Sequence, residues 1–259
     1  MTGRPARPFL PDVTLVAVTS VALQPTVQAL RASIEQVHFG KVLLLSDTEP
    51  PGLSPAICWR PISRLGSRAD YSRFMLRDLA DHVTTSHALC VQWDGYVLRG
   101  GAWNPDFLDY DYIGAPWPQF RDGHNVGNGG FSLRSRRLLQ ASQHVAFEQG
   151  EGEDLVICRT HRPALEGLGL RFAPAAVAAT FSYERSRPSG REFGFHGAFN
   201  LVDHLSRGRA LNLFRSLEPE ILARNERWEL LRWALSRGHL HLAAAMIAKL
   251  RDQKRSEQS

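Results

Sequence analysis

A strand, helix, strand pattern near the start of the chain constrains its fold more than any other feature. Residues 13–19 form a continuous apolar run of strand length, which is typical of a strand covered on both faces. A helical repeat of apolar residues spans 24–37 behind Pro25, and residues 41–46 form a second apolar run. Because such crossover connections are right-handed and join parallel strands, this βαβ unit predicts an α/β sheet.

The alternation of strands and helices continues up to an acidic residue, Asp94. Residues 56–59 predict a short third strand, residues 68–83 carry a helical apolar stripe, and residues 87–92 form the next apolar strand. That strand runs directly into Asp94 and Gly95. Ligands of open α/β sheets collect at the carboxyl ends of strands, so we expect Asp94 to face a crevice; a tight turn is the simpler interpretation of Asp94 and Gly95 alone.

The last part of the chain has a different composition. Residues 135–145 and 153–165 predict two further helices. From residue 218 onward, apolar residues recur at helical spacing in two segments separated by residues 236–239, which predicts a helical hairpin with a charged tail. We place a boundary near residues 213–217.

Composition limits the class of protein. With 259 residues, 43% of them hydrophobic, the chain can bury one sizeable core or one large domain with a small appendage. The net charge of +5 is modest and its arginines are scattered, which suits an anionic small substrate or a membrane-associated acceptor better than a nucleic acid. No apolar run approaches the roughly 20 residues that cross a bilayer, and the first residues lack an apolar signal segment, so we expect a cytoplasmic protein. The three cysteines are far apart and are predicted to be free, buried thiols.

The stretch from residue 90 to 135 gathers acids, aromatic residues, prolines and glycines without a strand or helix period, which is typical of a site. Four short sequence motifs in this part of the chain and beyond it could belong to such a site, and each also has a simpler structural interpretation. Asn128 with its glycines also predicts a hairpin turn, and Glu153 and Asp154 also suit the first turn of a helix. A lone histidine such as His196 is more often structural.

Taken together, Gln92-Trp93-Asp94, Asn128-Gly129-Gly130-Phe131, Gly152-Glu153-Asp154 and His196 resemble the conserved core of the GT-A glycosyltransferases, which use nucleotide-sugar donors. The string DYDYIGAPW at residues 109–117, with VGNGGFSLRS at 126–135, resembles the bacterial DUF5672 family, regarded as glycosyltransferase-like. The resemblance covers about residues 13–200 and leaves the C-terminal hairpin outside.

The resemblance implies a GT-A-like mixed sheet flanked by helices, with a C-terminal helical hairpin. It divides the chain into a glycosyltransferase domain at 1–215, with a nucleotide-binding half at 1–95 and an acceptor half at 96–215, and a hairpin at 216–259. It implies inverting sugar transfer from a nucleotide diphosphate sugar, foremost a UDP-sugar, to a glycan or lipid-linked glycan in bacterial surface polysaccharide synthesis. Asp154 would then be the general base, and Glu153 would orient the substrate.

The resemblance also assigns binding residues. The donor side comprises Thr19, Arg68, Tyr71, Gln92, Asp94, Gly95, Asn128, Gly129 and Gly130, and the acceptor side comprises Trp103, Asp111, Trp117 and Phe131. Packing that supports the site is the other interpretation of the acceptor-side residues. Asp94 and His196 would hold a divalent metal, Mn²⁺ or Mg²⁺, but Gln92 stands where the family's DxD motif has its first acid, which leaves the ion one carboxylate fewer.

Several alternatives compete with this prediction. A Rossmann oxidoreductase requires GxGxxG after the first strand and a P-loop kinase requires GxxxxGK[ST], and the chain has neither. A non-catalytic carbohydrate- or nucleotide-binding module of the same fold stays open, with Gln92 in its favour and Glu153-Asp154 against it. The hairpin leaves homodimerisation or another partner contact open, and the acceptor leaves open a peripheral association with the inner face of the membrane.

Overall fold

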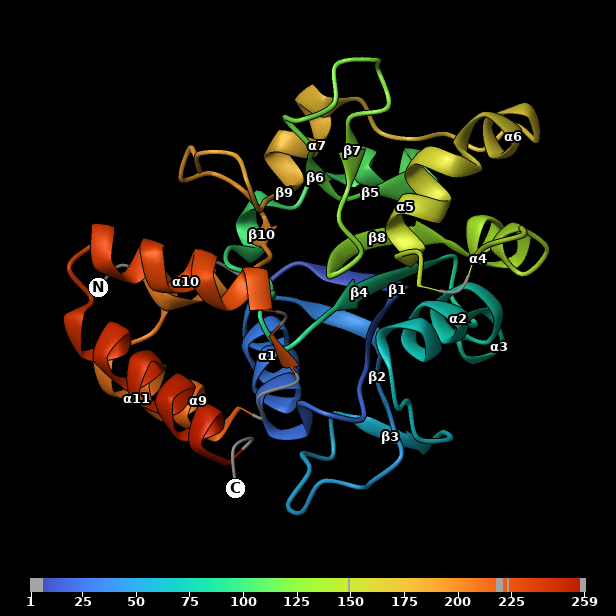
Figure 1. The fold of residues 1–259 in the computed structure, drawn as a ribbon. Coiled ribbons are helices and arrows are strands. Elements are labelled where there is room, and N and C mark those ends of the chain that lie inside the picture. The colour runs from blue at the N-terminus through green and yellow to red at the C-terminus, as the bar shows by residue number, and fades with distance from the viewer. Residues whose placement is uncertain (1–6, 149, 218–220, 223, 257–259) are drawn as a thin grey trace, which may run out of the picture. The chain divides into compact units, whose positions relative to one another are not determined.

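The computed structural model describes residues 7–148, 150–217, 221–222 and 224–256. Its centre is a six-stranded sheet in the order β3-β2-β1-β4-β8-β5 (Figure 1). The strands are β1 (Phe9–Val18), β2 (His38–Ser46), β3 (Cys58–Pro61), β4 (His87–Val91), β5 (Tyr112–Ile113) and β8 (Phe131–Ser135). The first four are mutually parallel, while β8 runs antiparallel to both β4 and β5, so the sheet is mixed.

The predicted βαβ unit is confirmed. Helix α1 (Leu23–Gln36) joins β1 to β2, and Leu15 of β1 pairs in parallel register with Val42. Thr19 follows β1, and its hydroxyl accepts a hydrogen bond from the Ala22 backbone N–H at 3.1 Å, just before the helix begins. The side chain of Thr19 therefore supports the turn into α1.

Side chains of the central strands enter two separate apolar cores. Leu15 packs in one core with Leu30 of α1. Val16, the next residue, packs in the other core with Phe74 of α2 (Arg68–Arg77) and Leu79 of α3 (Leu79–His82). Because successive side chains of a strand point to opposite faces, both faces of the sheet are covered, and this explains why the strands read as continuous apolar runs. The predicted α/β class is confirmed, with a mixed sheet flanked by helices.

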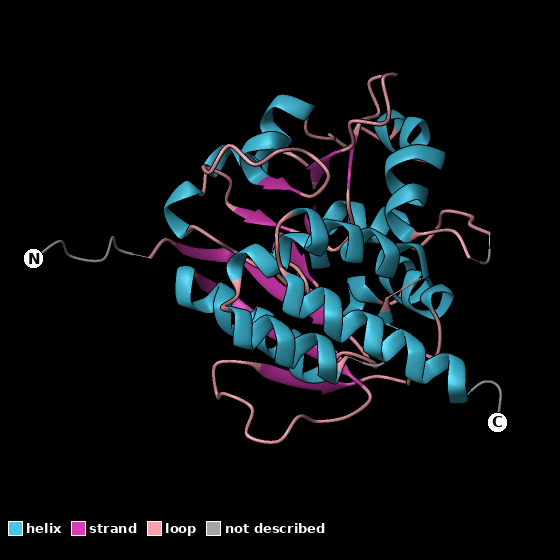
Figure 2. Cartoon of the chain, turned by 60° about the vertical axis from the view of Figure 1, so that its left-hand side comes forward, coloured by secondary structure: helices cyan, strands magenta, loops and turns pink. Residues whose placement is uncertain are grey.

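Between residues 100 and 195, short helices and two short strand pairs lie outside the six-stranded sheet (Figure 2). These are the 3₁₀ helices η1 (Gly100–Ala102) and η2 (Pro105–Asp109), the strand pairs β6 (Ala115–Pro116) with β7 (Val126–Gly127) and β9 (Ser182–Tyr183) with β10 (Gly194–Phe195), and the helices α4 (Arg136–Ser142), α5 (Glu153–Leu155), α6 (Arg162–Gly167) and α7 (Ala175–Phe181). A π-helix, η3 (Val156–Thr160), separates α5 from α6. The predicted single helix from residue 153 to 165 is therefore three short segments.

One prediction about cysteines is wrong. Cys90 and Cys158 are free and buried as expected, but Cys58 is exposed. Cys58 opens β3, which is the edge strand of the sheet, and only one of its four residues is even half-buried. An edge strand has a neighbour on one side only, so local apolar character did not predict its burial.

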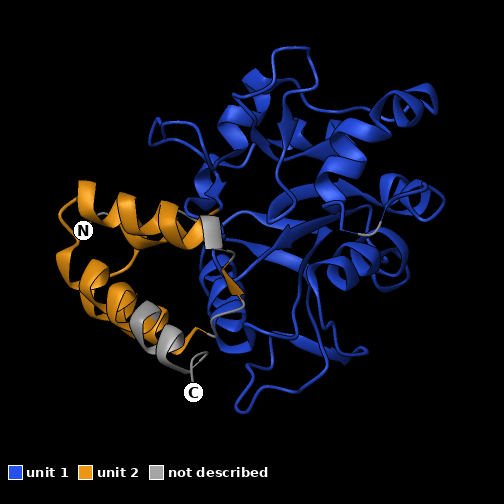
Figure 3. Ribbon diagram, viewed as in Figure 1, with its two compact units in different colours: residues 1–196 blue, residues 197–259 orange. Residues whose placement is uncertain are grey.

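By its internal contacts the chain divides into two compact units, residues 1–196 and 197–259 (Figure 3). The second contains α8 (Ala198–Leu201), η4 (Val202–His204), α9 (Arg207–Ser216), α10 (Arg224–Ser236) and α11 (Leu240–Ser256), with α11 packed against α9 and α10. The predicted boundary at 215/216 falls at the end of α9 and stays a prediction about domains; the predicted start of the hairpin, residues 218–220, lies outside the described residues. None of the helices described is both long and apolar enough to cross a bilayer.

Candidate functional site

The site begins where β4 ends. The Gln92 backbone N–H donates to the carbonyl of Gly130 at 3.0 Å, which brings the glycine-rich segment beside the strand end. The Gln92 side chain donates through Nε2 to the Tyr71 hydroxyl at 2.8 Å, so α2 also contributes to this edge. Burial, reinforced by the negative charge of Glu153, raises the pKa of Tyr71, whose hydroxyl therefore stays protonated.

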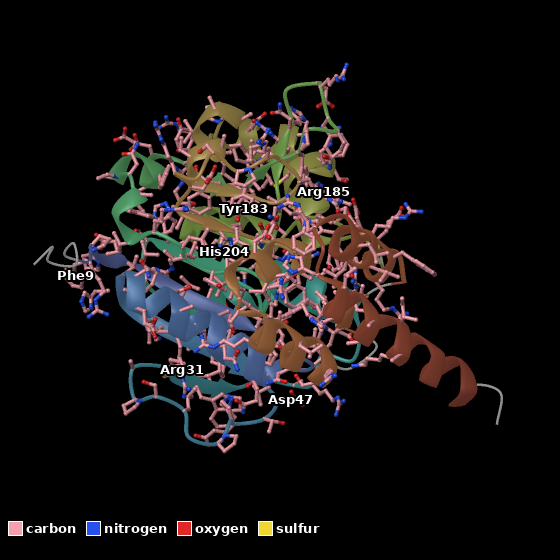
Figure 4. All side chains as sticks on the ribbon, turned by 90° about the vertical axis from the view of Figure 1, so that its left-hand side faces the viewer. Phe9, Arg31, Asp47, Tyr183, Arg185 and His204 are labelled. Atoms are coloured by element: carbon pink, nitrogen blue, oxygen red, sulfur yellow. The ribbon has the colours of Figure 1, made fainter. Side chains whose placement is uncertain are left out.

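His196 lies at the centre of an acidic cluster. Its Nε2 atom lies 3.2 Å from Asp94 Oδ1 and 3.2 Å from Gln92 Oε1, and its Nδ1 atom lies 3.4 Å from Glu184 Oε1. Burial disfavours the charged imidazolium, but the negative charges of Asp94 and Glu184 outweigh burial and raise the pKa of His196 well above its usual value. Glu184 directly follows β9, whose last residue, Tyr183, is labelled in Figure 4.

The glycine-rich loop separates this cluster from a second group of acids. A Cβ atom on Gly130 would lie 2.0 Å from His196 Nε2, and one on Gly129 would lie 1.9 Å from Glu153 Oε1. Only residues without side chains can pass between these groups. Asn128 adopts a φ of 75°, and its Oδ1 accepts from the Gly130 N–H at 3.1 Å, so its side chain stabilises the loop.

Asp154 and Glu153 have different environments although they are adjacent. Asp154 Oδ2 accepts from the Gly129 N–H at 3.1 Å, and the residue is only partly buried. Burial and the negative charge of Glu153 raise the pKa of Asp154 to about 6. Such a carboxylate can accept a proton near neutral pH, as a general base must. The π-helix η3 starts two residues later, and helical irregularities of this kind are frequent at functional sites.

Glu153 is instead a buried partner of Arg134. Nη2 of Arg134 donates to Glu153 Oε1 at 2.8 Å and to the Gly129 carbonyl at 3.3 Å, and Arg134 Nε donates to Ser132 Oγ at 3.0 Å. Arg134 is fully buried on β8. One guanidinium therefore connects the glycine loop to the helix that begins at Glu153.

The family model described as "Protein of unknown function (DUF5672)" matches residues 60–196, more than half of the chain, and covers every group just described. The chain belongs to the DUF5672 family. The family resemblance noted from the sequence is thereby confirmed.

The DUF5672 chain is similar to two solved glycosyltransferase structures at low identity. One is the mannosyltransferase PcManGT from Pyrobaculum calidifontis in complex with GDP-Man and Mn²⁺, with 15% identity and a TM-score of 0.45 over 98% of this chain and 82% of the other. The other is the apo form of the glycosyltransferase GlyE from Streptococcus pneumoniae TIGR4, with 13% identity and a TM-score of 0.45 over 71% of this chain and 54% of the other. No curated protein matches the chain.

The structure brings most of the predicted donor-side residues together. Tyr71, Gln92 and Asp94 lie around His196 as described, and a Cβ atom on Gly95 would lie 3.1 Å from the His196 ring. Arg68 is exposed at the first position of α2.

Most of the predicted acceptor-side residues pack against other parts of the chain. Phe131 is buried in the core, Trp103 meets the rings of Phe107 and Phe193 edge-on, and the Trp117 ring fills the space above Gly127.

Asp111 is also buried, and it accepts from the Arg171 backbone N–H at 2.8 Å and from the Ser135 hydroxyl. Its carboxylate therefore holds two chain segments together.

Two residues of the DUF5672 site were not predicted from the sequence. Arg134 occupies a strand position that is buried, and only the presence of a charge inside the run FSLRS could have drawn attention to it. Glu184 gives no signal in the sequence, because its partner His196 is twelve residues away across a loop between two short strands.

The residues of the site fit a cation in part. Asp94 Oδ1 is buried and accepts no aligned hydrogen bond from the described residues, although His196 Nε2 lies close to it. A carboxylate oxygen in this state suits a positive ion, with Gln92 Oε1 as a neighbouring donor; His196 Nε2 would join them only if the ion displaces the proton that Asp94 and Glu184 favour on this ring. Within the described parts of the chain, no three His, Cys, Asp or Glu side chains are grouped closely enough to hold a metal. Substrate oxygens or water would have to complete the coordination.

Proposed function

We propose that this DUF5672 protein is a glycosyltransferase that moves a sugar from a nucleotide diphosphate sugar to a hydroxyl of a glycan or lipid-linked glycan. The observation that carries the proposal is Asp154, a carboxylate with a pKa of about 6 that is held by Gly129 of the glycine loop. On the other side of the same loop, Gly130 meets the cluster of His196 and Asp94. Sugar transfer requires a base for the acceptor hydroxyl and groups that stabilise the leaving diphosphate. Asp154 on one side of the glycine loop suits the first role, and the cluster of His196 and Asp94 on the other side suits the second.

In the proposed reaction, Asp154 takes the proton of the acceptor hydroxyl while the oxygen attacks the anomeric carbon of the sugar. The bond from that carbon to the diphosphate oxygen breaks, and the nucleoside diphosphate leaves with the electron pair. Attack from the face opposite the leaving group inverts the anomeric configuration. The raised pKa of Asp154 matches this role, because the group is ionised at neutral pH and basic enough to accept a proton.

Charge in the site favours a cation on the donor side. Among the described residues, the acids Asp94 and Glu184 lie beside the His196 ring, and Glu153 and Asp154 lie on the side of the loop where Arg134 pairs with Glu153. A diphosphate adds further negative charge, so we assign Asp94 and His196, with Gln92, to a Mn²⁺ or Mg²⁺ ion. When bound, the ion neutralises the charge that develops on the leaving diphosphate.

We assign Glu153 a different role from the one that the family resemblance implies. Its Oε1 atom accepts from the buried Arg134 and its side chain is only 7% exposed, so little of the carboxylate is available to a substrate. Glu153 therefore positions Asp154 and raises its pKa through negative charge.

We assign packing rather than acceptor contact to the predicted acceptor-side residues, because each is held by other side chains or backbone of the chain; these residues are Trp103, Asp111, Trp117 and Phe131. Bacterial surface polysaccharide assembly stays the proposed pathway.

Asp154→Asn separates the enzyme from a non-catalytic module of the same fold. We expect the unmodified protein to release nucleoside diphosphate from a UDP- or GDP-sugar in the presence of Mn²⁺ and an oligosaccharide acceptor mixture. Asp154→Asn should lower turnover by about 100-fold or more and retain donor binding, since it removes only the base. Asp12→Asn, at an exposed residue near the amino end of β1, is the matched control and should leave turnover unchanged. Donor binding without any turnover in the unmodified protein would favour the binding module.

A further inference from the structure

The positive charge of the chain is concentrated in its second unit. Residues 197–259 hold 11 of the 31 lysines and arginines but only 7 of the 26 acids, a net charge of +4 out of +5. The first unit is therefore almost neutral, although it is three times as long. Such an asymmetry indicates that the second unit meets an anionic partner.

One face of α10 combines exposed apolar side chains with this charge. Trp228 and Leu235 are 51% and 50% exposed, and the exposed Arg232 lies between them. The spacing i, i+4, i+7 places these three residues in one stripe along the helix. Leu240, at the first position of α11 just past the turn, is 63% exposed. We call Trp228, Arg232 and Leu235 the apolar-basic stripe.

The other residues of α10 explain why the stripe is not core. Leu230, Leu231 and Ala234 are buried and supply the packing of the helix within its unit. The two acids of α10, Glu226 and Glu229, are half-buried, and Glu229 borders the stripe three residues before Arg232. The exposed side chains of the stripe are therefore tryptophan, arginine and leucine, and the acids beside them are less exposed.

We propose that the apolar-basic stripe docks the protein onto an anionic lipid surface. Tryptophan and leucine suit the boundary between headgroups and acyl chains, where an aromatic ring and an aliphatic chain can be partly buried while the helix lies in the plane of the surface. Arginine and the remaining positive charge of the unit are attracted by anionic headgroups. A second copy of the chain fits less well, because two such stripes would bring two units of +4 together.

The test is co-sedimentation of the full chain with vesicles. We expect binding to phosphatidylcholine vesicles in which roughly a third of the lipid is phosphatidylglycerol, little binding to pure phosphatidylcholine, and weakening by salt. Arg232→Gln should reduce the vesicle affinity about fivefold, and the double variant Trp228→Ala/Leu235→Ala about tenfold or more. All three residues are exposed, so circular dichroism should show unchanged folding.

Matched controls lie in the first unit. Leu168 is 68% exposed and Arg73 is exposed on α2, so Leu168→Ala and Arg73→Gln repeat the same chemical changes away from the stripe. Neither should alter vesicle binding. Equal binding to neutral vesicles, unchanged binding of the stripe variants, or a dimer that the double variant dissociates would each overturn the proposal. Nucleotide binding is unaffected by any of these outcomes, so the test is independent of the proposed reaction.

Discussion

Replacing Arg134 by methionine should destabilise the protein by several kcal/mol, because the buried Glu153 carboxylate would lose its only cationic partner among the described residues. The two side chains are 0% and 7% exposed and are joined at 2.8 Å. Breaking a buried ion pair by removing one partner costs about 3–5 kcal/mol. Arg134 also donates to the Gly129 carbonyl and to Ser132 Oγ, and each lost hydrogen bond adds about 1 kcal/mol.

The double variant Arg134→Met/Glu153→Met separates the stability lost with the ion pair from the stability lost with the other hydrogen bonds of Arg134. It removes both charges and keeps similar volumes, so only the hydrogen bonds to Gly129 and Ser132 stay lost, about 2 kcal/mol. The double variant should therefore be about 3–5 kcal/mol more stable than Arg134→Met alone. If Arg134→Met fails to fold, a folded double variant would still show that the unpaired charge of Glu153 is the cause.

Urea unfolding followed by tryptophan fluorescence measures these differences as shifts of the midpoint at unchanged slope. Arg159→Met is the control. Arg159 forms a bidentate pair with Asp122 at 2.7 Å whose side chains are 24% and 54% exposed, so the loss of this pair should cost much less than the loss of the buried one. A single variant no less stable than Arg159→Met, or a double variant as unstable as the sum of its single changes, would refute the reasoning.

Two further predictions concern the loop and the base. Gly130→Ala should lower stability by about 1–3 kcal/mol and weaken nucleotide binding, because its Cβ would lie 2.0 Å from His196 Nε2. Thermal unfolding measures the stability and calorimetry measures the binding. An unchanged stability and an unchanged affinity would contradict the packing described. Turnover at low donor concentration should rise with pH through about 6 and then level off, since Asp154 must be ionised to accept a proton, and a profile flat from pH 5 to 7 would exclude Asp154 as the base. The raised pKa of Asp154 affects stability in the opposite direction. The folded chain binds the Asp154 proton more tightly than the unfolded chain, in which the pKa of this group is near 3.8. The stabilisation that comes from this proton is therefore complete below pH 3.8 and is lost as the pH rises through about 6.

The sheet could be predicted from the sequence because its signals are local. Apolar runs and a helical repeat follow each other within 35 residues, and the two cores of the sheet explain why both β1 and β2 lack alternation. The position of Asp94 beyond β4 followed from the same pattern. Whether a strand lies at the edge is not local information, and for this reason the exposure of Cys58 was not predicted.

The site was predictable only where its residues form a motif. Asp94, the glycine loop and Asp154 belong to recognisable sequence motifs, and the structure places Asp94 with His196 on one side of the loop and Asp154 against Gly129. Arg134 could not be assigned, because its partner Glu153 is 19 residues away and nothing in the sequence shows that β8 turns this guanidinium inward.

Asp111 shows the opposite difficulty. An acid among aromatic residues resembled a sugar ligand, yet its carboxylate holds Arg171 and Ser135 in place. Side-chain partners that are distant in the chain decide such roles, and composition does not contain them.

The most direct test of the account is a calorimetric titration of UDP and of GDP into the purified protein, each with Mn²⁺ and with EDTA. We predict that one of the two nucleotides binds in Mn²⁺, that EDTA weakens the binding at least tenfold, and that Asp94→Asn weakens it similarly, because Asp94 provides the carboxylate oxygen for the ion. The absence of binding by either nucleotide under both conditions would contradict the assignment of this site to a nucleotide-sugar donor.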